Sequence, residues 1–116
     1  MLPEEDSVRL RHMLDAALEA LSFADGRSRQ DLDADRMFSR AVVQDIEIIG
    51  EAAGRVSGQT QGQLPSIPWS SITSMRNRLI HGYFDIDLDR VWDTLVDDLP
   101  PLIEELRRIL DTESPG

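Results

Sequence analysis

Cysteine and lysine are absent from the sequence and aromatic residues are few, and each shortage restricts what the protein can be. Without cysteine the chain can form neither a disulfide bridge nor a thiolate metal site, which fits a reducing compartment. Aromatic residues make up 5% of the chain, so the core has to be aliphatic. The sequence also lacks a run of about 18 apolar residues, which a membrane-spanning helix requires, and it begins with MLPEEDSVRLRHM rather than with the apolar run of a signal peptide. We therefore expect a soluble, cytoplasmic protein with no membrane partner.

Positive charge is scarce as well. The chain carries 12 basic and 22 acidic residues, a net charge of −10, and a surface of that sign repels nucleic acid. A protein of this composition can bind RNA only through a local basic patch. All 12 basic residues are arginine, whose planar guanidinium group suits phosphate.

Apolar residues recur along the chain with the period of a helix. The length suits one domain, which we expect to span residues 1–116. A first amphipathic helix is predicted from about residue 4 to residue 25, where Gly26 ends it, and the polar stretch 27–35 predicts a loop. A second helix is predicted over 35–56, with an apolar stripe wide enough for a central, buried position. That stripe consists of Phe38, Val42, Ile46, Ile49 and Ala53.

Glycine and proline residues mark the next boundaries. Gly50 lies inside the second helix and predicts a close approach of another helix, because glycine otherwise destabilises a helix by about 1 kcal/mol relative to alanine. The polar, glycine-containing stretch 57–68 predicts one long loop, and Pro68 suits the first position of a third helix. That helix is predicted over 69–81, with Ile72, Met75 and Leu79 toward the core and Gly82 at its exit.

The last third of the chain continues the helical pattern. Asp85 or Asp87 can cap a helix whose apolar stripe runs to Leu99. Pro100 and Pro101 predict a kink or break there, because proline donates no backbone hydrogen bond. Apolar residues with helical spacing resume from Leu102. No segment shows the alternation of a strand, so the predicted fold is all-α, a bundle of four to five helices.

The segment from Arg76 to Tyr83, RNRLIHGY, differs from the packing pattern around it. It brings two arginines, an asparagine, a histidine and the only tyrosine together. Asn77 and His81 are four residues apart and share a helix face. Arg76 lies about 140° from His81 on an ideal helix, but its side chain is long and His81 is at the helix end. Tyr83 follows Gly82, where the helix no longer fixes its direction.

This set of side chains suits phosphoryl transfer within RNA. A histidine with an ordinary pKa of about 6.5 can accept or donate a proton at neutral pH. An arginine can hold the phosphate and stabilise the charge that grows on its oxygens. RNA supplies its own nucleophile, the 2′-hydroxyl, so the reaction needs neither metal nor cofactor. One chain offers only His81 and the distant His12, and a two-fold dimer with His81 near the axis would supply both an acid and a base.

Arg76, Asn77, His81 and Tyr83 form the pattern R-N-x3-H-x-Y, which resembles the R-x4-H-x-Y motif of the HEPN superfamily and specifically of HepT-like toxins. The resemblance extends from about Phe38 to Leu110. FSRAVVQDIEIIGEAA is similar to the second helix of that family, IPWSSITSMRNRLIHGYF to its signature helix, and VWDTLVDDLPPLIEEL to its closing helices.

The resemblance implies a HEPN-type bundle and a homodimeric, metal-independent endoribonuclease of a toxin–antitoxin pair. It implies catalytic roles for Arg76 and His81, supporting roles for Asn77 and Arg78, and no metal or cofactor. The partner would be a minimal nucleotidyltransferase antitoxin, which in the family transfers AMP from ATP to the motif tyrosine. By position that tyrosine is Tyr83.

Two other classes of function remain open. The chain could be a non-catalytic dimeric HEPN module that docks a nucleotidyltransferase and is modified by it, or a purely structural helical dimer. The acidic surface favours the docking module over the ribonuclease, because it weakens the attraction to RNA. The intact arginine, asparagine and histidine favour the ribonuclease, since docking does not require them together. We predict the ribonuclease toxin.

Several residues around the motif have simpler interpretations. Arg78 could line an RNA groove or pair with an acidic neighbour. His12 is expected to be solvated or at a dimer edge. The two tryptophans, Trp69 and Trp92, are interpreted as packing residues. The carboxylates are interpreted as helix caps or solvated charge: Asp85, Asp87 and Asp89.

Overall fold

Helices make up most of the computed structural model, which describes residues 2–79 and 85–113 except for the side chains of Arg76 and Arg78. Within those residues the only β-type pairing is a single bridge at Ile86, so the predicted all-α class is confirmed. In chain order the elements are α1 (Glu4–Ala24), α2 (Arg29–Ala34), α3 (Arg36–Gly54), α4 (Gly58–Gln63), α5 (Trp69–Thr73), α6 (Met75–Leu79), α7 (Leu88–Asp93), the π-helical turn η1 (Thr94–Asp98) and α8 (Leu99–Glu113).

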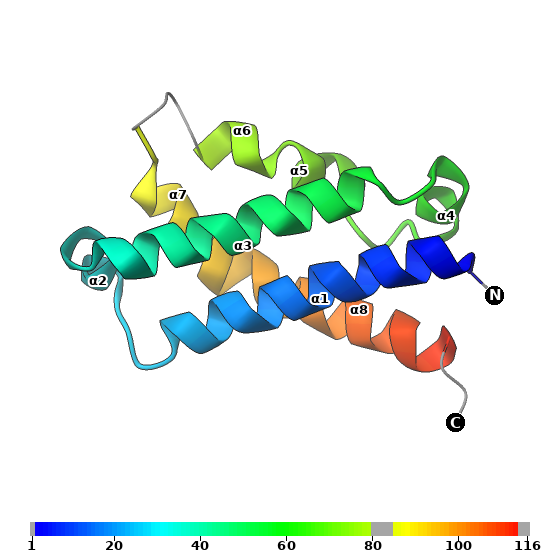
Figure 1. Cartoon of the computed structure of the whole chain (residues 1–116), viewed down its shortest axis with the longest axis horizontal. Helices are drawn as coiled ribbons and strands as arrows, with labels where there is room; N and C mark the ends of the chain where they lie inside the picture. Colours follow the sequence, from blue (N-terminus) through cyan, green and yellow to red (C-terminus); the bar gives the residue numbers. More distant parts are fainter. Residues whose placement is uncertain (1, 80–84, 114–116) are drawn as a thin grey trace.

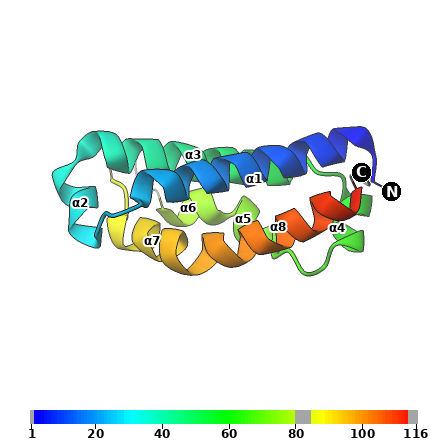
Figure 2. The ribbon, with the colours of Figure 1, turned by 90° about the horizontal axis from the view of Figure 1, so that it is seen from below.

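The long helices α1, α3 and α8 form the body of the bundle. α1 and α3 run antiparallel and side by side, and α8 packs against α1 (Figures 1 and 2). α5 and α6 lie along the other side of α3, while α2 contacts both α3 and α7 at one end of the molecule. The predicted stripe of the second helix is confirmed, because all five of its residues are buried: Phe38, Val42, Ile46, Ile49 and Ala53.

The first helix ends where the sequence predicts, but the two predicted loops are partly helical. Gly26 has a φ of +73°, a conformation that glycine adopts without strain. Beyond it, Ser28 and Asp31 start α2, with the Ser28 backbone N donating to Asp31 Oδ2 at 2.7 Å. In the second predicted loop, Ser57 starts α4 by accepting from the Thr60 backbone N at 3.3 Å. Capping by polar side chains thus forms single helical turns that apolar periodicity does not reveal.

A buried carboxylate fixes the start of α4 to α1. Asp6 is 4% exposed, accepts from the Ser57 backbone N at 3.0 Å and from Ser57 Oγ at 2.6 Å, and also accepts from Thr60 Oγ1. Burial opposes its ionisation, but these hydrogen bonds outweigh burial and hold the pKa of Asp6 below its ordinary value. Folding therefore stabilises the ionised carboxylate of Asp6.

Gly50 allows α3 to approach α5 closely, as predicted. A Cβ at this position would lie 3.3 Å from the backbone oxygen of Ile72, tighter than ordinary van der Waals contact. The helix predicted over 69–81 is divided at Ser74 into α5 and α6, because Ser74 Oγ donates to the Ser70 carbonyl at 2.8 Å and competes with the backbone ladder. Residues 80–82, where the predicted helix ends, lie outside the described residues.

The two prolines of the last segment do not end the helix. Residues 88–113 are helical throughout, and the interruption falls one turn earlier, in η1. There the Leu99 backbone N donates to the carbonyl of Thr94, five residues back. Pro100 and Pro101 interrupt the backbone hydrogen bonds of the helix, since neither can donate to the preceding turn, and the π turn accommodates this interruption. The predicted break is thus wrong, because a local widening of the helix takes its place, and the predicted kink stays a prediction.

Candidate functional site

Helix α6 carries three of the predicted site residues, Arg76, Asn77 and Arg78. Met75 and Leu79, four residues apart, are 4% and 1% exposed and fix one face of α6 to the core. Asn77 is exposed, because two residues turn a helix by about 200°. Arg76 and Arg78 belong to α6 through their backbone. The packing of α6 therefore exposes Asn77 to solvent.

The other predicted site residues, His81 and Tyr83, lie outside the described residues, but the chain on either side of them is fixed. The Asp87 backbone N donates to the carbonyl of Leu79 at 2.7 Å. Asp87 also begins α7, where its Oδ1 accepts from the Arg90 backbone N at 3.1 Å. The end of α6 and the start of α7 are thus held together, and His81 and Tyr83 lie between them in the sequence.

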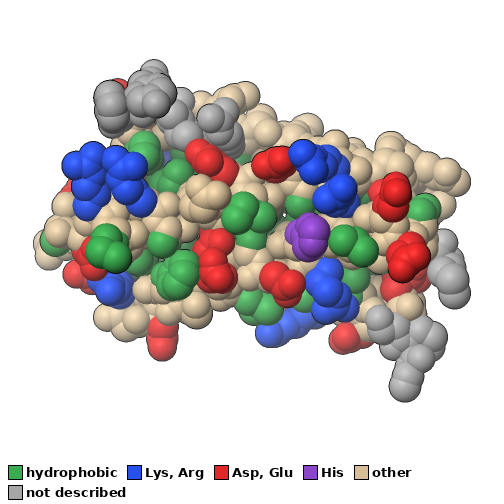
Figure 3. All heavy atoms as spheres, viewed as in Figure 1, with side chains coloured by type: hydrophobic (Ala, Val, Ile, Leu, Met, Phe, Trp, Pro, Cys, Tyr) green, Lys and Arg blue, Asp and Glu red, His purple; other side chains and the backbone are tan. Residues whose placement is uncertain are grey.

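His12 is exposed on α1, away from the motif helix. It is the purple side chain in Figure 3, which views the face formed by α1 and α3. It lines a small cavity of about 100 Å³ together with Arg9 of α1 and Arg55 at the end of α3. The expectation of a solvated histidine is confirmed, and a place at a dimer edge stays a prediction.

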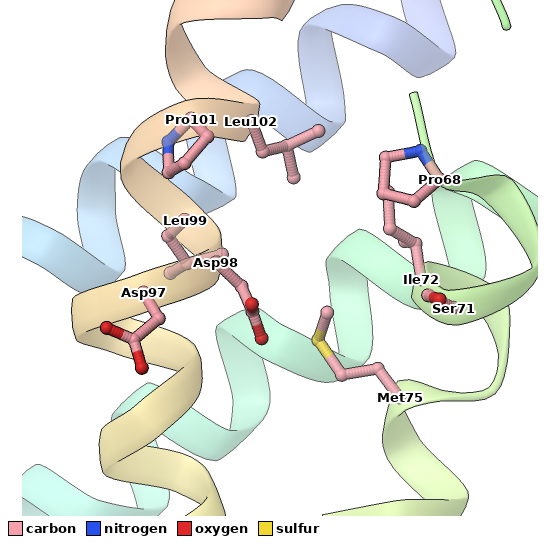
Figure 4. Close-up of a pocket in the computed structure, with 9 residues that line it drawn as sticks. All are labelled: Pro68, Ser71, Ile72, Met75, Asp97, Asp98, Leu99, Pro101 and Leu102. Carbon is pink, nitrogen blue, oxygen red and sulfur yellow. The ribbon is translucent and has the colours of Figure 1, made fainter. Parts of the chain in front are cut away.

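Two adjoining cavities separate α5 and α6 from the helices that come after them in the chain. The larger, of about 340 Å³, has an apolar wall and carries the carboxylates of Asp97 and Asp98 (Figure 4). Asp98 points into the gap between η1 and Met75. The second, of about 260 Å³, shares these residues and adds Arg90 and Asp93. The groove on this side of α6 is therefore acidic.

The carboxylates after the motif act as the sequence predicts. Asp87 caps α7, and Asp89 Oδ1 pairs with Arg29 at 2.8 Å, while Asp85 is exposed. Among the described residues no group of three or more histidine, cysteine or acidic side chains is placed to hold a metal ion. The tryptophans are packing residues, as predicted: both are partly buried against the core, and Trp69 Nε1 donates to the Leu64 carbonyl at 3.0 Å.

Sequence reasoning missed a buried carboxyl group between α1 and α3. Asp45 is 2% exposed, and its Oδ2 has no hydrogen-bond partner among the described atoms. Burial, together with the nearby Glu19, raises the pKa of Asp45 to about 7. The sequence does contain a sign of this buried carboxyl group, because Asp45 lies between Val42 and Ile49 at the edge of the buried stripe. Asp45 is not part of any recognised motif.

Comparison with known proteins assigns the chain to a family. The described residues form an all-α bundle, which is consistent with a HepT-like protein of the HEPN superfamily. The model of the Ribonuclease HepT-like family matches residues 13–109, and the chain belongs to this family. No helix of the described residues has the length and apolar character to cross a membrane.

Relatives match over most of their length. A protein of Caldanaerobacter subterraneus named a "Putative RNase" is 32% identical over 104 residues, 90% of this chain and 93% of the relative. A "Probable ribonuclease HepT" of Thermococcus cleftensis is 37% identical over 82 residues, 68% of this chain and 74% of the relative. A "Putative RNase" of Methanocaldococcus jannaschii is 30% identical over 97 residues, 84% of this chain and 89% of the relative. No solved structure matches the chain significantly.

Proposed function

We propose that this protein is a cytoplasmic, metal-independent endoribonuclease and the toxin of a toxin–antitoxin pair. The observation that carries the proposal is helix α6 of a Ribonuclease HepT-like chain, which exposes Asn77 and is joined to the start of α7 by the hydrogen bond from the Asp87 backbone N to the Leu79 carbonyl. The exposure of Asn77 supports the proposal, because a polymer can reach an exposed side chain and cannot reach a buried one.

The proposed reaction uses the RNA's own hydroxyl group. The 2′-oxygen attacks the adjacent phosphorus, the bond from phosphorus to the 5′-oxygen breaks, and the products are a 2′,3′-cyclic phosphate and a 5′-hydroxyl. His81 takes the proton from the 2′-hydroxyl, and His81 of the partner subunit gives a proton to the leaving 5′-oxygen. Arg76 stabilises the charge on the phosphate oxygens, with help from Asn77 and Arg78.

RNA cleavage is expected to continue in the presence of EDTA and to require the 2′-hydroxyl of the RNA. The purified protein should cut single-stranded RNA and leave a 2′,3′-cyclic phosphate or the 3′-phosphate formed from it, as measured by mass spectrometry of the fragments. The same oligonucleotide with hydrogen at every 2′ position is the control and should stay intact. Activity that EDTA removes and magnesium restores would refute the mechanism.

A two-fold dimer is expected because each chain supplies one motif histidine and the reaction needs an acid and a base. Light scattering at micromolar concentration should give twice the mass of the 13.1 kDa chain. A mass of one chain under these conditions would contradict the two-histidine mechanism.

Tyr83 is proposed as the residue through which a minimal nucleotidyltransferase antitoxin silences the protein. AMP on this tyrosine adds a negative phosphate that competes with the RNA phosphate for Arg76 and Arg78. Wild type incubated with such a partner and ATP should gain mass in AMP units and lose cleavage, whereas Tyr83→Phe should keep its mass and much of its activity. AMP found on another residue would overturn this assignment.

The alternative function is a non-catalytic dimeric HEPN module that docks and is modified by a nucleotidyltransferase. The acidic groove beside α6 favours it, because Asp93, Asp97 and Asp98 repel RNA phosphates on that side. Modification of Tyr83 without any cleavage by the unmodified dimer would support this alternative.

A further inference from the structure

The ion pairs of the described residues leave two neighbouring arginines without a partner at one end of α3. Arg27 pairs with Asp35 at 2.9 Å, and Arg29 pairs with Asp33 at 2.9 Å and with Asp89 at 2.8 Å. Arg36 and Arg40, by contrast, are exposed and form no ion pair with any residue that the structure describes. They are four residues apart and share a helix face, and basic side chains gather over the start of α3 in Figure 3.

The packing of α3 shows where this pair lies relative to the motif. α5 and α6 run antiparallel to α3 in Figure 1, and a Cβ on Gly50 would lie 3.3 Å from the Ile72 backbone oxygen, so Ile72 lies at the level of Gly50. At about 1.5 Å per residue in both helices, the seven residues from Ile72 to Leu79 bring the end of α6 to the level of Val43. Figure 1 shows the same arrangement.

Arg36 and Arg40 therefore lie just beyond the end of α6. Arg36, Val43 and Gly50 follow one another at intervals of seven residues, and they lie along nearly one line of the helix surface. Gly50 and Val43 face α5 and α6, whereas Arg36 is on the same line past the end of α6 and is exposed.

Helix stability does not explain the position of Arg36. It is the first residue of α3, where the positive end of the helix dipole disfavours a cation. The acidic groove lined by Asp97 and Asp98 lies on the opposite flank of α6, between that helix and η1. A polyanion that reaches α6 is thus repelled on one flank and attracted on the other.

We propose that Arg36 and Arg40 bind the phosphate backbone of the RNA on the α3 side of the motif. This inference rests on the proposed ribonuclease function and assigns residues outside the motif to substrate binding. The two guanidinium groups contact successive phosphates of a single strand, which crosses the first turns of α3 and does not enter the acidic groove. Contacts of this kind hold the strand without reading its bases.

The test compares the double variant Arg36→Gln/Arg40→Gln with a matched control, Arg11→Gln/Arg107→Gln. The control removes two exposed arginines, from α1 and α8, that also lack an ion pair within the described part of the chain. Binding is measured with a single-stranded RNA that carries 2′-O-methyl groups and resists cleavage, at several salt concentrations. The first variant should bind about tenfold more weakly, and its slope of log Kd against log salt should fall by about 1.4, or 0.7 per phosphate contact. The control should match wild type.

Cleavage and stability measurements separate binding from folding. The Arg36→Gln/Arg40→Gln variant should show a raised KM with kcat close to wild type, and a melting temperature equal to or above that of wild type. If its RNA affinity and salt slope equal those of wild type, the inference is wrong, and this includes the case in which the two arginines serve a protein partner. Wild-type protein that neither binds nor cleaves RNA refutes the proposed function itself, which is a different outcome.

Discussion

Replacing His81 by alanine is expected to lower RNA cleavage by about 10²–10⁴-fold, the usual contribution of general acid–base catalysis. A larger loss is expected than for any residue of the surrounding bundle, because both proton transfers pass through this side chain in a two-fold dimer. The rate constant at saturating RNA is the quantity to measure. Arg76→Ala should produce a loss of similar size, because it removes the contact that stabilises charge on the phosphate. Asn77→Ala should be milder.

The chain supplies its own control for this experiment. His12 is the other histidine, and it is exposed on α1. His12→Ala should leave cleavage intact, and circular dichroism should show an equally helical fold for all variants. If His81→Ala cleaves at the wild-type rate while remaining dimeric, the histidine is not catalytic and the docking module becomes the better description.

Replacing Asp45 by asparagine is expected to stabilise the protein at pH 8 and to remove most of its pH dependence above pH 4. The ordinary pKa of this carboxyl group is 3.8, and burial beside Glu19 raises it to about 7 in the folded protein. Between these two values the folded state binds more protons than the unfolded state, so stability falls as the pH rises and levels off above pH 7. The shift corresponds to roughly 4 kcal/mol, a large part of the stability of a small domain.

Urea unfolding at pH 5 and pH 8 measures this effect. The free energy of unfolding of wild type should fall by about 2.7 kcal/mol across this interval, because about two pH units lie between pH 5 and the folded pKa, whereas that of Asp45→Asn should change little. Asp15→Asn is the matched control, because it removes an exposed carboxylate from α1 and should follow wild type. The lowered pKa values of Asp6, Asp35 and Glu105 affect stability only at more acidic pH, so they do not obscure the comparison. Parallel curves for wild type and Asp45→Asn would contradict the assignment of the buried proton to this residue.

Long-range features of the fold could be predicted from the sequence because burial repeats along a helix. The stripe from Phe38 to Ala53, the close approach at Gly50 and the stop at Gly26 each follow from one local cause and are confirmed. Helices α2 and α4 could not be found in this way. Each is six residues long and is started by a serine cap, so neither is long enough to display a period.

Some features of the candidate site could likewise be predicted from the sequence, and others could not. The sequence places Arg76, Asn77 and Arg78 on a helix, and the structure confirms it, while the roles of these residues stay a prediction. That Arg36 and Arg40 lack an ion pair among the described residues could not be predicted, since it depends on which carboxylates Arg27 and Arg29 take in three dimensions. Asp45 escaped notice for a similar reason, because its neighbour Glu19 is contributed by another helix.

The π turn between α7 and α8 has a consequence for the alignment of the two halves of the C-terminal helix. A turn closed five residues back holds one residue more than an α-helical turn, and each added residue rotates the remainder of the helix by about 100°. Deleting the exposed Val96 would restore a regular α-helical turn, yet it would rotate the buried face of α8 away from its present neighbours, which include α1. The extra residue therefore sets the rotation of α8 about the helix axis relative to α7. With this rotation, one continuous helix packs against α6 with its first half and against α1 with its second half.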